Sequence, residues 1–292
     1  MSSVERIEQL PPAPARPVDG HKGTFGRVMI VAGSAGMSGA ACLAGYGALC
    51  GGAGLVTLAI PQSLVNIVAS VEPSWLTLPL ADTDGHLSKR SIGLLEQSLR
   101  NQSVVAIGPG LGDSDGVRST VQHLYATSSL PMVVDADGLN AFASQSDELT
   151  RPAETAPRVL TPHPGEFARL LSRGNTDTRQ VQEELAIAFA AKHQVILLLK
   201  GAQTITTDGH RLAINRTGNS GMATGGSGDV LTGLISALLA QGMSPFEATQ
   251  LGAHLHGLAG DIAAELHSPQ AMIASNIHQC LGLAWQQFLQ AS

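Results

Sequence analysis

The stretch that most constrains this chain covers residues 219–239 and reads NSGMATGGSGDVLTGLISALL. Its first part consists of small residues, whereas residues 230–239 have apolar side chains at helical spacing. The pattern predicts a helix that begins at the glycine run. Glycine lets backbone N–H groups approach a ligand, and a helix N-terminus has unpaired donors and a dipole that favours an anion. We therefore predict an anion hole at Gly226, Ser227 and Gly228.

Asp229 directly follows this glycine run. A carboxylate beside a bound phosphate is repelled by it, so its presence there indicates a group that takes up a proton. We interpret Asp229 as a general base. The alternative is a first-turn residue that interacts only with the helix dipole.

Composition favours a single α/β domain. The chain has 292 residues, of which 43% are hydrophobic, only 3% aromatic and 33 glycine, which suits helices packed closely on a parallel sheet. Residues 1–20 are polar and proline-rich and are expected to form a flexible N-terminal arm; residues 21–292 are expected to form the domain. The net charge of −6 argues against nucleic acid or a membrane surface as partner.

The three cysteines have no metal-ligand spacing, and no long apolar run or leader is present, so we expect a cytoplasmic protein. Apolar segments of strand type recur along the chain and end in glycine or polar residues. The carboxyl ends of parallel strands meet at one edge of a sheet, where ligands bind. The following loops should therefore converge. The expected strands are 27–32, 55–60, 75–80, 103–107, 132–134, 159–161 and 195–199, followed by a hairpin at 204–218.

Several polar residues at these strand ends are candidates for chemistry. Asp135 and Asp137 alternate on an extended segment; they serve either as helix cap and turn residues or in holding metal or phosphate-bound water. Glu166 either caps a helix or holds a Mg²⁺-bound water. His163, fixed between two prolines, favours a ligand contact over a core position. Lys200 suits a phosphate or ribose contact.

Five motifs occur together in this order: GPGLG at 108–112, DADGLN at 135–140, TPHPGE at 161–166, LKGAQT at 199–204 and GNSGMATGGSGDVLTG at 218–233. In combination they resemble the ADP-dependent NAD(P)H-hydrate dehydratases, which belong to the ribokinase-like superfamily. The resemblance covers residues 22–288. It implies a three-layer α/β/α fold with a central, mostly parallel sheet.

The resemblance also implies a reaction. A dehydratase of this family, a carbon–oxygen lyase, removes water from the (S)-epimer of NADHX or NADPHX and restores NADH or NADPH, while ADP is converted to AMP and phosphate. Mg²⁺ is the expected cofactor, and ADP is a co-substrate. By the same resemblance we expect a homo-oligomer, a tetramer, and a separate NAD(P)H-hydrate epimerase as functional partner.

Residue roles follow from matching positions. Ala41, Gly110, His163 and Asp229 match substrate-contacting positions of the family. The nucleotide contacts of the AMP side match Lys200, Gly201, Ala202, Gln203, Thr204 and Gly228. The resulting hypothesis is that Asp229 deprotonates the hydrate hydroxyl, which attacks the β-phosphate of ADP; the phosphate then leaves in place of hydroxide.

Two alternatives remain open. A small-molecule kinase of the same superfamily, of the hydroxymethylpyrimidine or hydroxyethylthiazole type, would have the same Gly-x-Gly-Asp site, and use of ATP with a phosphorylated product would identify it. A nucleotide-binding regulatory module would bind ADP without releasing phosphate. Asp229 argues against the module, because a pure anion site gains nothing from a carboxylate.

Overall fold

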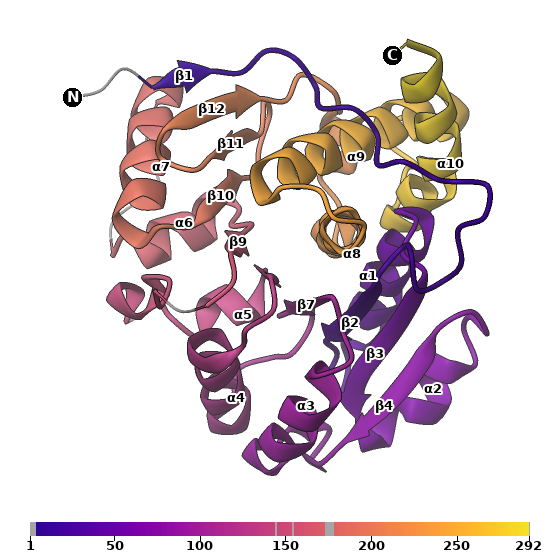
Figure 1. Cartoon of the computed structure of the whole chain (residues 1–292), viewed down its shortest axis with the longest axis vertical. Coiled ribbons are helices and arrows are strands. Elements are labelled where there is room, and N and C mark those ends of the chain that lie inside the picture. The colour runs from indigo at the N-terminus through magenta and orange to yellow at the C-terminus, as the bar shows by residue number, and fades with distance from the viewer. Residues whose placement is uncertain (1–3, 144, 154, 173–177, 292) are drawn as a thin grey trace.

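The computed structural model describes residues 4–143, 145–153, 155–172 and 178–291, and its centre is a ten-stranded sheet within these residues (Figure 1). Across the sheet the strands are β1 (Glu5–Arg6), β12 (Arg211–Ile214), β11 (Ile205–Thr207), β10 (Ile196–Leu199), β9 (Arg158–Leu160), β8 (Met132–Val134), β7 (Val104–Ile107), β2 (Arg27–Val31), β3 (Leu55–Pro61) and β4 (Leu76–Leu80). From β10 to β4 all neighbours are parallel, whereas β11 pairs antiparallel with both β10 and β12. The expected strands, the hairpin and the mostly parallel sheet are therefore confirmed.

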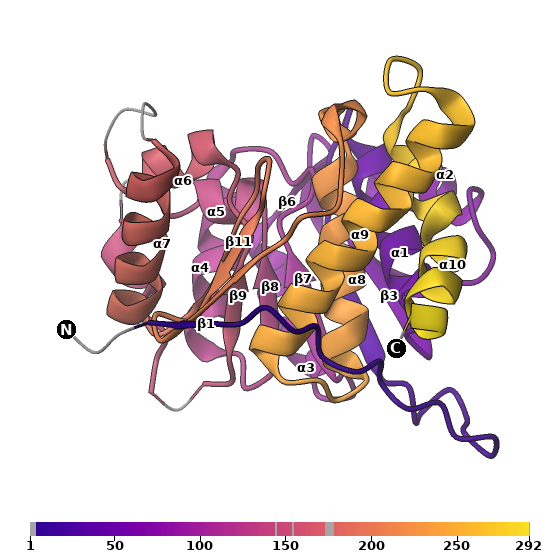
Figure 2. The ribbon, with the colours of Figure 1, turned by 90° about the horizontal axis from the view of Figure 1, so that it is seen from above.

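Helices cover both faces of the sheet, which gives the expected three layers (Figure 2). On one face lie α1 (Ser38–Cys50), α2 (Val65–Ala69), α8 (Ser227–Ala240), α9 (Pro245–His267) and α10 (Ala274–Ala291). On the other lie α3 (Ile92–Leu99), α4 (Asp115–Thr127), α5 (Asp137–Asn140), α6 (Pro164–Leu170) and α7 (Arg179–His193). A small hairpin of β5 (Asp82–Thr83) and β6 (His86–Leu87) forms a separate sheet.

The central strands are apolar on both sides because each side faces a layer of helices. In β2, Val28 and Ile30 belong to the core under α1 and α8, whereas Met29 and Val31 belong to the core under α3 and α4. Alternate residues of a strand point to opposite faces, so a continuous apolar run serves both cores. This explains why the strand segments of the sequence read as unbroken apolar stretches.

Helix α8, which carries the glycine run, packs very closely against α1. A Cβ added at Gly233 would lie 1.9 Å from the carbonyl oxygen of Ala44, and one added at Gly47 would lie 2.1 Å from that of Val230. The two helix backbones therefore touch directly, which only glycine permits at these positions. The small residues of α1 thus serve packing within the domain.

Arg158 at the start of β9 is fully buried, a position that its sequence context does not signal. Its guanidinium donates five hydrogen bonds, at 2.7–3.2 Å, to the backbone carbonyls of Tyr125, Ser128, Leu130 and Ala156. Burial lowers the pKa of Arg158 to about 10, so the side chain stays charged at neutral pH. The side chain thus holds the loop between α4 and β8 in place through hydrogen bonds to backbone carbonyls.

The first part of the expected flexible arm lies against the domain, whereas residues 15–19 are exposed. β1 pairs parallel with β12, and Gln250 of α9 donates a hydrogen bond of 2.9 Å to the carbonyl of Gln9. The arm runs along the edge of the sheet and across α9 in Figures 1 and 2. Composition gave no sign of this, because main-chain pairing with an edge strand depends little on side chains. Residues 1–3 lie outside the described part of the chain.

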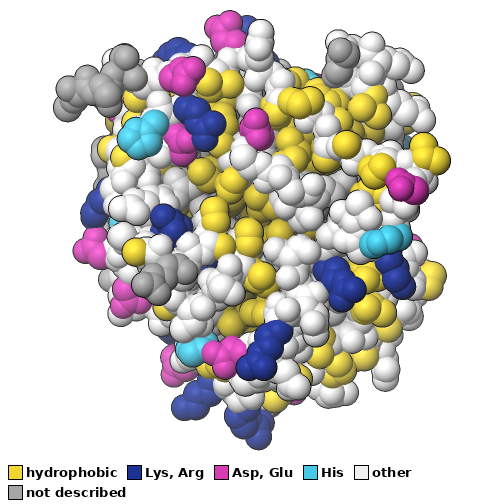
Figure 3. Space-filling model, in the orientation of Figure 1, with side chains coloured by type: hydrophobic (Ala, Val, Ile, Leu, Met, Phe, Trp, Pro, Cys, Tyr) yellow, Lys and Arg dark blue, Asp and Glu magenta, His cyan; other side chains and the backbone are white. Residues whose placement is uncertain are grey.

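The face of the molecule in Figure 3 shows Lys and Arg side chains scattered among Asp and Glu, without one basic patch on that face. Among the described residues, no helix combines the length and the apolar character that crossing a bilayer requires.

Candidate active site

The loops that follow the parallel strands converge at one edge of the sheet, as expected. The N–H of Gly33 donates to the carbonyl of Pro109 at 2.8 Å, which joins the loops after β2 and β7. The N–H of Lys200 donates to the carbonyl of Pro162 at 2.9 Å, which joins the loops after β10 and β9. The motifs recognised in the sequence therefore come together in space.

Asp135 and Asp137 occupy different environments, as their alternation suggests. Asp135 is 1% exposed, and its carboxylate accepts hydrogen bonds from Lys200 Nζ at 2.7 Å and from Thr232 Oγ1 at 2.8 Å. Asp137 accepts from the N–H of Gly112 at 2.8 Å and so fixes the GPGLG loop. Neither is a helix N-cap; Asp137 is the first residue of α5, whose N-cap is Ala136.

His163 and Glu166 form a capping box at the start of α6. Nδ1 of His163 accepts hydrogen bonds from the N–H groups of Gly165 and Glu166, and Glu166 Oε2 accepts from the N–H of His163 at 2.7 Å. The capping interpretation of Glu166 is thus confirmed. Its carboxylate also lies 3.8 Å from Lys200 Nζ. Burial raises the pKa of Glu166 and lowers that of His163, which is neutral at pH 7.

The N-terminus of α8 has the geometry of an anion hole. Gly226 is the N-cap with φ of 94°, a left-handed conformation, and a Cβ there would lie 2.4 Å from Leu43 Cδ1. In the described part of the chain no hydrogen bond is recorded for the N–H groups of Gly226 and Gly228. The N–H of Asp229 instead donates to the Gly226 carbonyl at 3.1 Å. The hydroxyl of Ser227 donates to the Met222 carbonyl at 2.8 Å, and its N–H donates to the Thr224 carbonyl at 3.4 Å. Its own carbonyl is bonded by His256, so Ser227 offers no free donor for the predicted anion hole, and Gly226 and Gly228 remain.

Asp229 lies among several charges at this edge. Burial raises its pKa from 3.8 to about 7, and the negative charge of Asp135 adds to the increase, while Lys200 opposes it. For Lys200 itself, burial disfavours the charge, but Asp135 and Glu166 outweigh burial and its pKa is raised. The site therefore places a cation that stays charged beside a carboxyl group that titrates near neutral pH. A group with that pKa is suited to general base catalysis.

Beside α8 lies a cavity of about 850 Å³. Most of the residues predicted for the nucleotide and the anion hole line it: Lys200, Gly201, Ala202, Gln203, Thr204, Ser227 and Gly228, with His163 at its side. Sequence reasoning missed other residues in its wall, which come from the 215–224 segment, from α8 and from α9: Asn215, Arg216, Thr217, Gly218, Asn219, Ser220, Met222, Ala223, Thr224, Leu231, Ala253, His256 and Gly257. The lining residues between 218 and 231 lie within the recognised 218–233 motif, which was the available signal, and residues 215–217 directly precede it; the three residues of α9 lie outside every recognised motif.

Of the four predicted substrate contacts only His163 lines this cavity; Asp229, one residue beyond the lining Gly228, and Gly110 and Ala41 do not. Gly110 has φ of 60°, and a Cβ there would meet Ala40 Cβ at 2.7 Å, so the GPGLG loop packs closely on the start of α1. Ala41 has no exposed surface. The contact of Ala41 with substrate therefore stays a prediction that its burial does not support, whereas Gly110 belongs to a loop held by Asp137 through the neighbouring Gly112.

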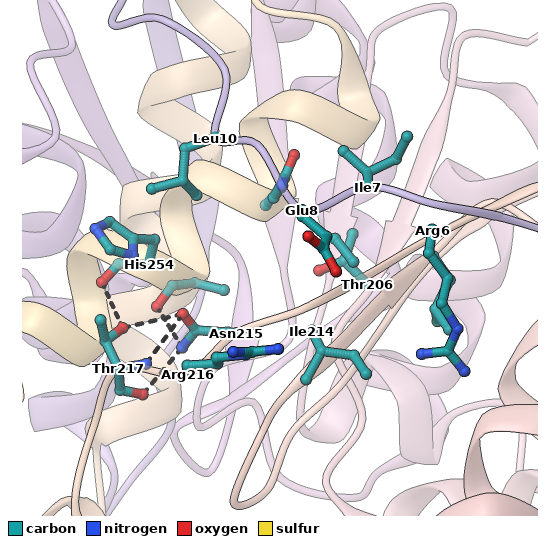
Figure 4. Close-up of a pocket in the computed structure, with 14 residues that line it drawn as sticks. Arg6, Ile7, Glu8, Leu10, Thr206, Ile214, Asn215, Arg216, Thr217 and His254 are labelled. Atoms are coloured by element: carbon teal, nitrogen blue, oxygen red, sulfur yellow. Dashed lines mark hydrogen bonds between the residues drawn. The ribbon is translucent and has the colours of Figure 1, made fainter. Parts of the chain in front are cut away.

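A second cavity, of about 350 Å³, lies between the N-terminal arm and β12 (Figure 4). It shares Asn215, Arg216 and Thr217 with the larger cavity, so this segment forms a wall between the two. Thr217 Oγ1 donates to the carbonyl of His254 at 2.9 Å, and Asn215 Nδ2 donates to the carbonyl of Thr217 at 3.0 Å. Asn215 Nδ2 also donates to the carbonyl of Ala253 at 3.2 Å. The bonds to His254 and Ala253 tie the wall to α9, and the bond from Asn215 to Thr217 lies within the wall.

Comparison with known sequences identifies the family. Residues 28–282 match the family model described as NAD(P)H-hydrate dehydratase. The chain is 45% identical over 267 residues to the bifunctional NAD(P)H-hydrate repair enzyme of Moorella thermoacetica, covering 90% of this chain and 50% of that protein. It is 33% identical over 280 residues to the ADP-dependent (S)-NAD(P)H-hydrate dehydratase of Bacillus subtilis, covering 94% of each. The chain thus spans about half the length of its bifunctional relatives.

Solved structures agree with this result. The ADP/ATP-dependent NAD(P)H-hydrate dehydratase from Bacillus subtilis, co-crystallized with ATP/Mg²⁺, superposes with a TM-score of 0.80 at 31% identity over 94% of both chains. A ribokinase-like superfamily protein from Enterococcus faecalis gives 0.79 at 26% identity, covering 94% of this chain and 92% of that protein. The fold is therefore ribokinase-like, and the chain belongs to the NAD(P)H-hydrate dehydratase family.

Proposed function

We propose that this chain catalyses the ADP-dependent dehydration of (S)-NADHX and (S)-NADPHX to NADH and NADPH, with release of AMP and phosphate. Membership of the family supports this activity. The observation that carries the mechanism is Asp229, whose pKa is raised to about 7 at the N-terminus of α8, beside a cavity large enough for a nucleotide.

In the proposed reaction Asp229 accepts the proton of the hydrate hydroxyl. The resulting oxygen nucleophile attacks the β-phosphate of ADP, the P–O bond to AMP breaks, and AMP leaves. The unpaired N–H groups of Gly226 and Gly228 donate to the phosphoryl oxygens. The ring nitrogen lone pair then expels phosphate, and loss of a ring proton restores the reduced nicotinamide. Phosphate leaves far more readily than hydroxide, which is why a dehydration uses a kinase-like site.

Lys200 to Thr204 line the cavity and are proposed to bind the AMP half of the nucleotide, while His163 borders the substrate side. Mg²⁺ fits the site because it keeps several waters and binds mainly to phosphates, with one or two carboxylates. Among the described residues no cluster of three or more His, Cys, Asp or Glu forms a cage for a metal, and Glu166 is the proposed contact, through water. When bound, Mg²⁺ neutralises charge on the phosphates.

The decisive experiment incubates the protein with (S)-NADHX and Mg²⁺, with ADP, with ATP and without nucleotide, and follows the absorbance of reduced nicotinamide. We expect recovery with nucleotide, and AMP and phosphate as products when it is ADP. Asp229→Asn should reduce turnover at least about 100-fold, while ADP is still bound and, above about pH 7, more tightly than by wild type because the repelling carboxylate is gone. Near-normal turnover of this variant would rule out the base.

The same assay separates the alternative activities. ATP consumption with a phosphorylated acceptor would indicate a small-molecule kinase, and ADP binding without phosphate release a regulatory module. A hydroxyethylthiazole kinase from Pyrococcus horikoshii superposes with a TM-score of 0.61, but at 19% identity it shows only the shared fold.

We further propose a cytoplasmic homo-oligomer, a tetramer, that works with an NAD(P)H-hydrate epimerase. The relatives named as bifunctional repair enzymes support the pairing. The free Cys42, Cys50 and Cys280 are consistent with a reducing compartment. The sheet ends at β4, where Leu76 is 57% exposed, and such an edge suits association. Light scattering coupled to size-exclusion chromatography tests the oligomeric state; a monomeric mass at working concentration would refute it.

A further inference from the structure

Asp135 has no chemical role in the proposed reaction, yet its buried carboxylate joins three elements. It follows β8, and its two oxygens accept hydrogen bonds from Lys200, after β10, at 2.7 Å and from Thr232 in α8 at 2.8 Å. Both Asp135 and Thr232 are essentially inaccessible to solvent. A buried charge with such partners is costly to disturb, so the three side chains hold a defined geometry.

The connection acts on the helix turn that carries the proposed base. Thr232 lies three residues after Asp229, so both belong to the same side of α8. The ion pair also lies directly against Gly228, because a Cβ added there would be 3.1 Å from Lys200 Nζ and 3.4 Å from Asp135 Oδ2. A side chain at Gly228 would therefore require Lys200 Nζ to shift by a few tenths of an ångström.

We propose that Asp135 is a positioning residue, which through Thr232 and Lys200 holds the first turn of α8 so that Asp229 faces the substrate and the Gly228 N–H faces the nucleotide. The catalytic consequence of this role rests on the proposed function. The positioning itself does not rest on it, because it concerns only how α8 is fixed to the edge of the sheet.

The charge of Asp135 provides a measurable sign of this role. The charged or titratable groups that act on Asp229 or its helix turn are Asp135 after β8, Asp137 on α5, Glu166 on α6, Lys200 after β10 and His256 on α9. His256 bonds the Ser227 carbonyl, and burial lowers its pKa to about 4, so it is neutral. Asp135→Asn removes a negative neighbour and frees the Lys200 charge to act on Asp229. Both changes lower the pKa of Asp229.

The first test uses a matched pair at Thr232, which leaves all charges in place. Thr232→Ser keeps the hydroxyl and should retain kcat, whereas Thr232→Val, of nearly the same shape, should lower kcat about tenfold or more, with a smaller change in KM for ADP. Equal kcat for the two variants would overturn the proposal, and so would an effect confined to KM.

The second test compares pH profiles. For Asp135→Asn we expect a lower plateau of kcat and an acidic limb displaced to lower pH. Asp147→Asn is the control, because it breaks an exposed ion pair to Lys192 of the same 2.7 Å length and should change neither quantity. An acidic limb at the wild-type position would refute the role of Asp135. If Asp135→Asn does not fold, the Thr232 pair decides alone.

A third measurement separates this inference from the proposed function. Calorimetric titration with ADP across pH 5 to 9 requires no turnover. A carboxylate beside the phosphates repels them, so affinity should fall as Asp229 ionises, and in Asp135→Asn this fall should occur at lower pH. Wild-type protein that binds ADP but never restores reduced nicotinamide would refute the proposed function only. Coincident pH midpoints in wild type and Asp135→Asn would refute the positioning role.

Discussion

The raised pKa of Asp229 makes a prediction about stability that needs no substrate. In the folded protein this carboxyl group titrates at about 7, against 3.8 as its ordinary value. Between these pH values the folded state binds a proton that the unfolded state has lost. The contribution of Asp229 to stability is therefore fully present below about pH 3.8 and is lost as the pH rises through about 7.

The size of the loss follows from the shift. Each pKa unit corresponds to about 1.4 kcal/mol, so three units give about 4 kcal/mol of destabilisation at pH 8. Asn has nearly the same shape without the charge. Its amide still requires hydrogen-bond partners in a partly buried position, which offsets part of the gain. We therefore expect Asp229→Asn to be more stable than wild type at pH 8 by about 2 to 4 kcal/mol, and close to wild type at pH 4.

Urea unfolding at a series of pH values measures this difference directly. Asp147→Asn serves as control: its pKa is lowered by Lys192 rather than raised, so its removal should bring no gain at pH 8. If Asp229→Asn gains less than about 1 kcal/mol, or if the gain does not grow from pH 4 to pH 8, the carboxylate is not destabilised by its site and the argument for the base fails. Confirmation would show that the proposed catalytic group lowers the stability of the fold.

Four further outcomes are expected. Arg158→Met leaves four buried carbonyls without their donor and should lower the free energy of unfolding by about 4 kcal/mol or more, whereas the exposed Arg118→Met should cost under about 0.5 kcal/mol; urea unfolding compares them. Gly233→Ala should force α8 from α1 and lower both the melting temperature and turnover, and an unchanged melting temperature would contradict the close contact. The pKa of His256 is lowered to about 4, so between about pH 6.5 and pH 4 only the unfolded state takes up a proton at this residue. On acidification through this range the free energy of unfolding of wild type should fall by about 3 kcal/mol relative to His256→Gln. Parallel curves of unfolding free energy against pH for the two proteins would refute this. Chelation of Mg²⁺ should abolish nucleotide-dependent turnover, and turnover that persists in excess chelator would exclude the metal.

Much of the fold could be predicted because its signals are local. Each expected parallel strand is present within a residue or two, since an apolar run with two covered faces differs clearly from an amphipathic helix. The arm at residues 4–20 and the buried Arg158 could not be predicted. Both depend on backbone groups of segments distant in the sequence. Backbone N–H and C=O groups are the same whatever the side chain, so the residue types give no sign of such contacts.

The candidate site shows the same division. Asp229 and its glycine run were recognisable because a helix start and its chemistry lie within a few adjacent residues. The capping of α6 by Glu166 is equally local, and only the choice between cap and metal contact was left open. The partners of Asp135 could not be found, because Lys200 is 65 residues away and Thr232 is 97 residues away.

The sequence by itself determined that the sheet is mostly parallel, that the functional residues lie at the carboxyl ends of its strands, and which residue is the proposed base. The signals for these features are local: a hydrophobic pattern, a glycine run and a helix start each lie within a few consecutive residues. Only the tertiary structure decided the order of the strands, the ion pair beneath Gly228 and the pKa of Asp229. Those properties arise from burial and from charges on four different elements. Coulomb and desolvation energies depend on distance in space, which the order of residues does not reveal.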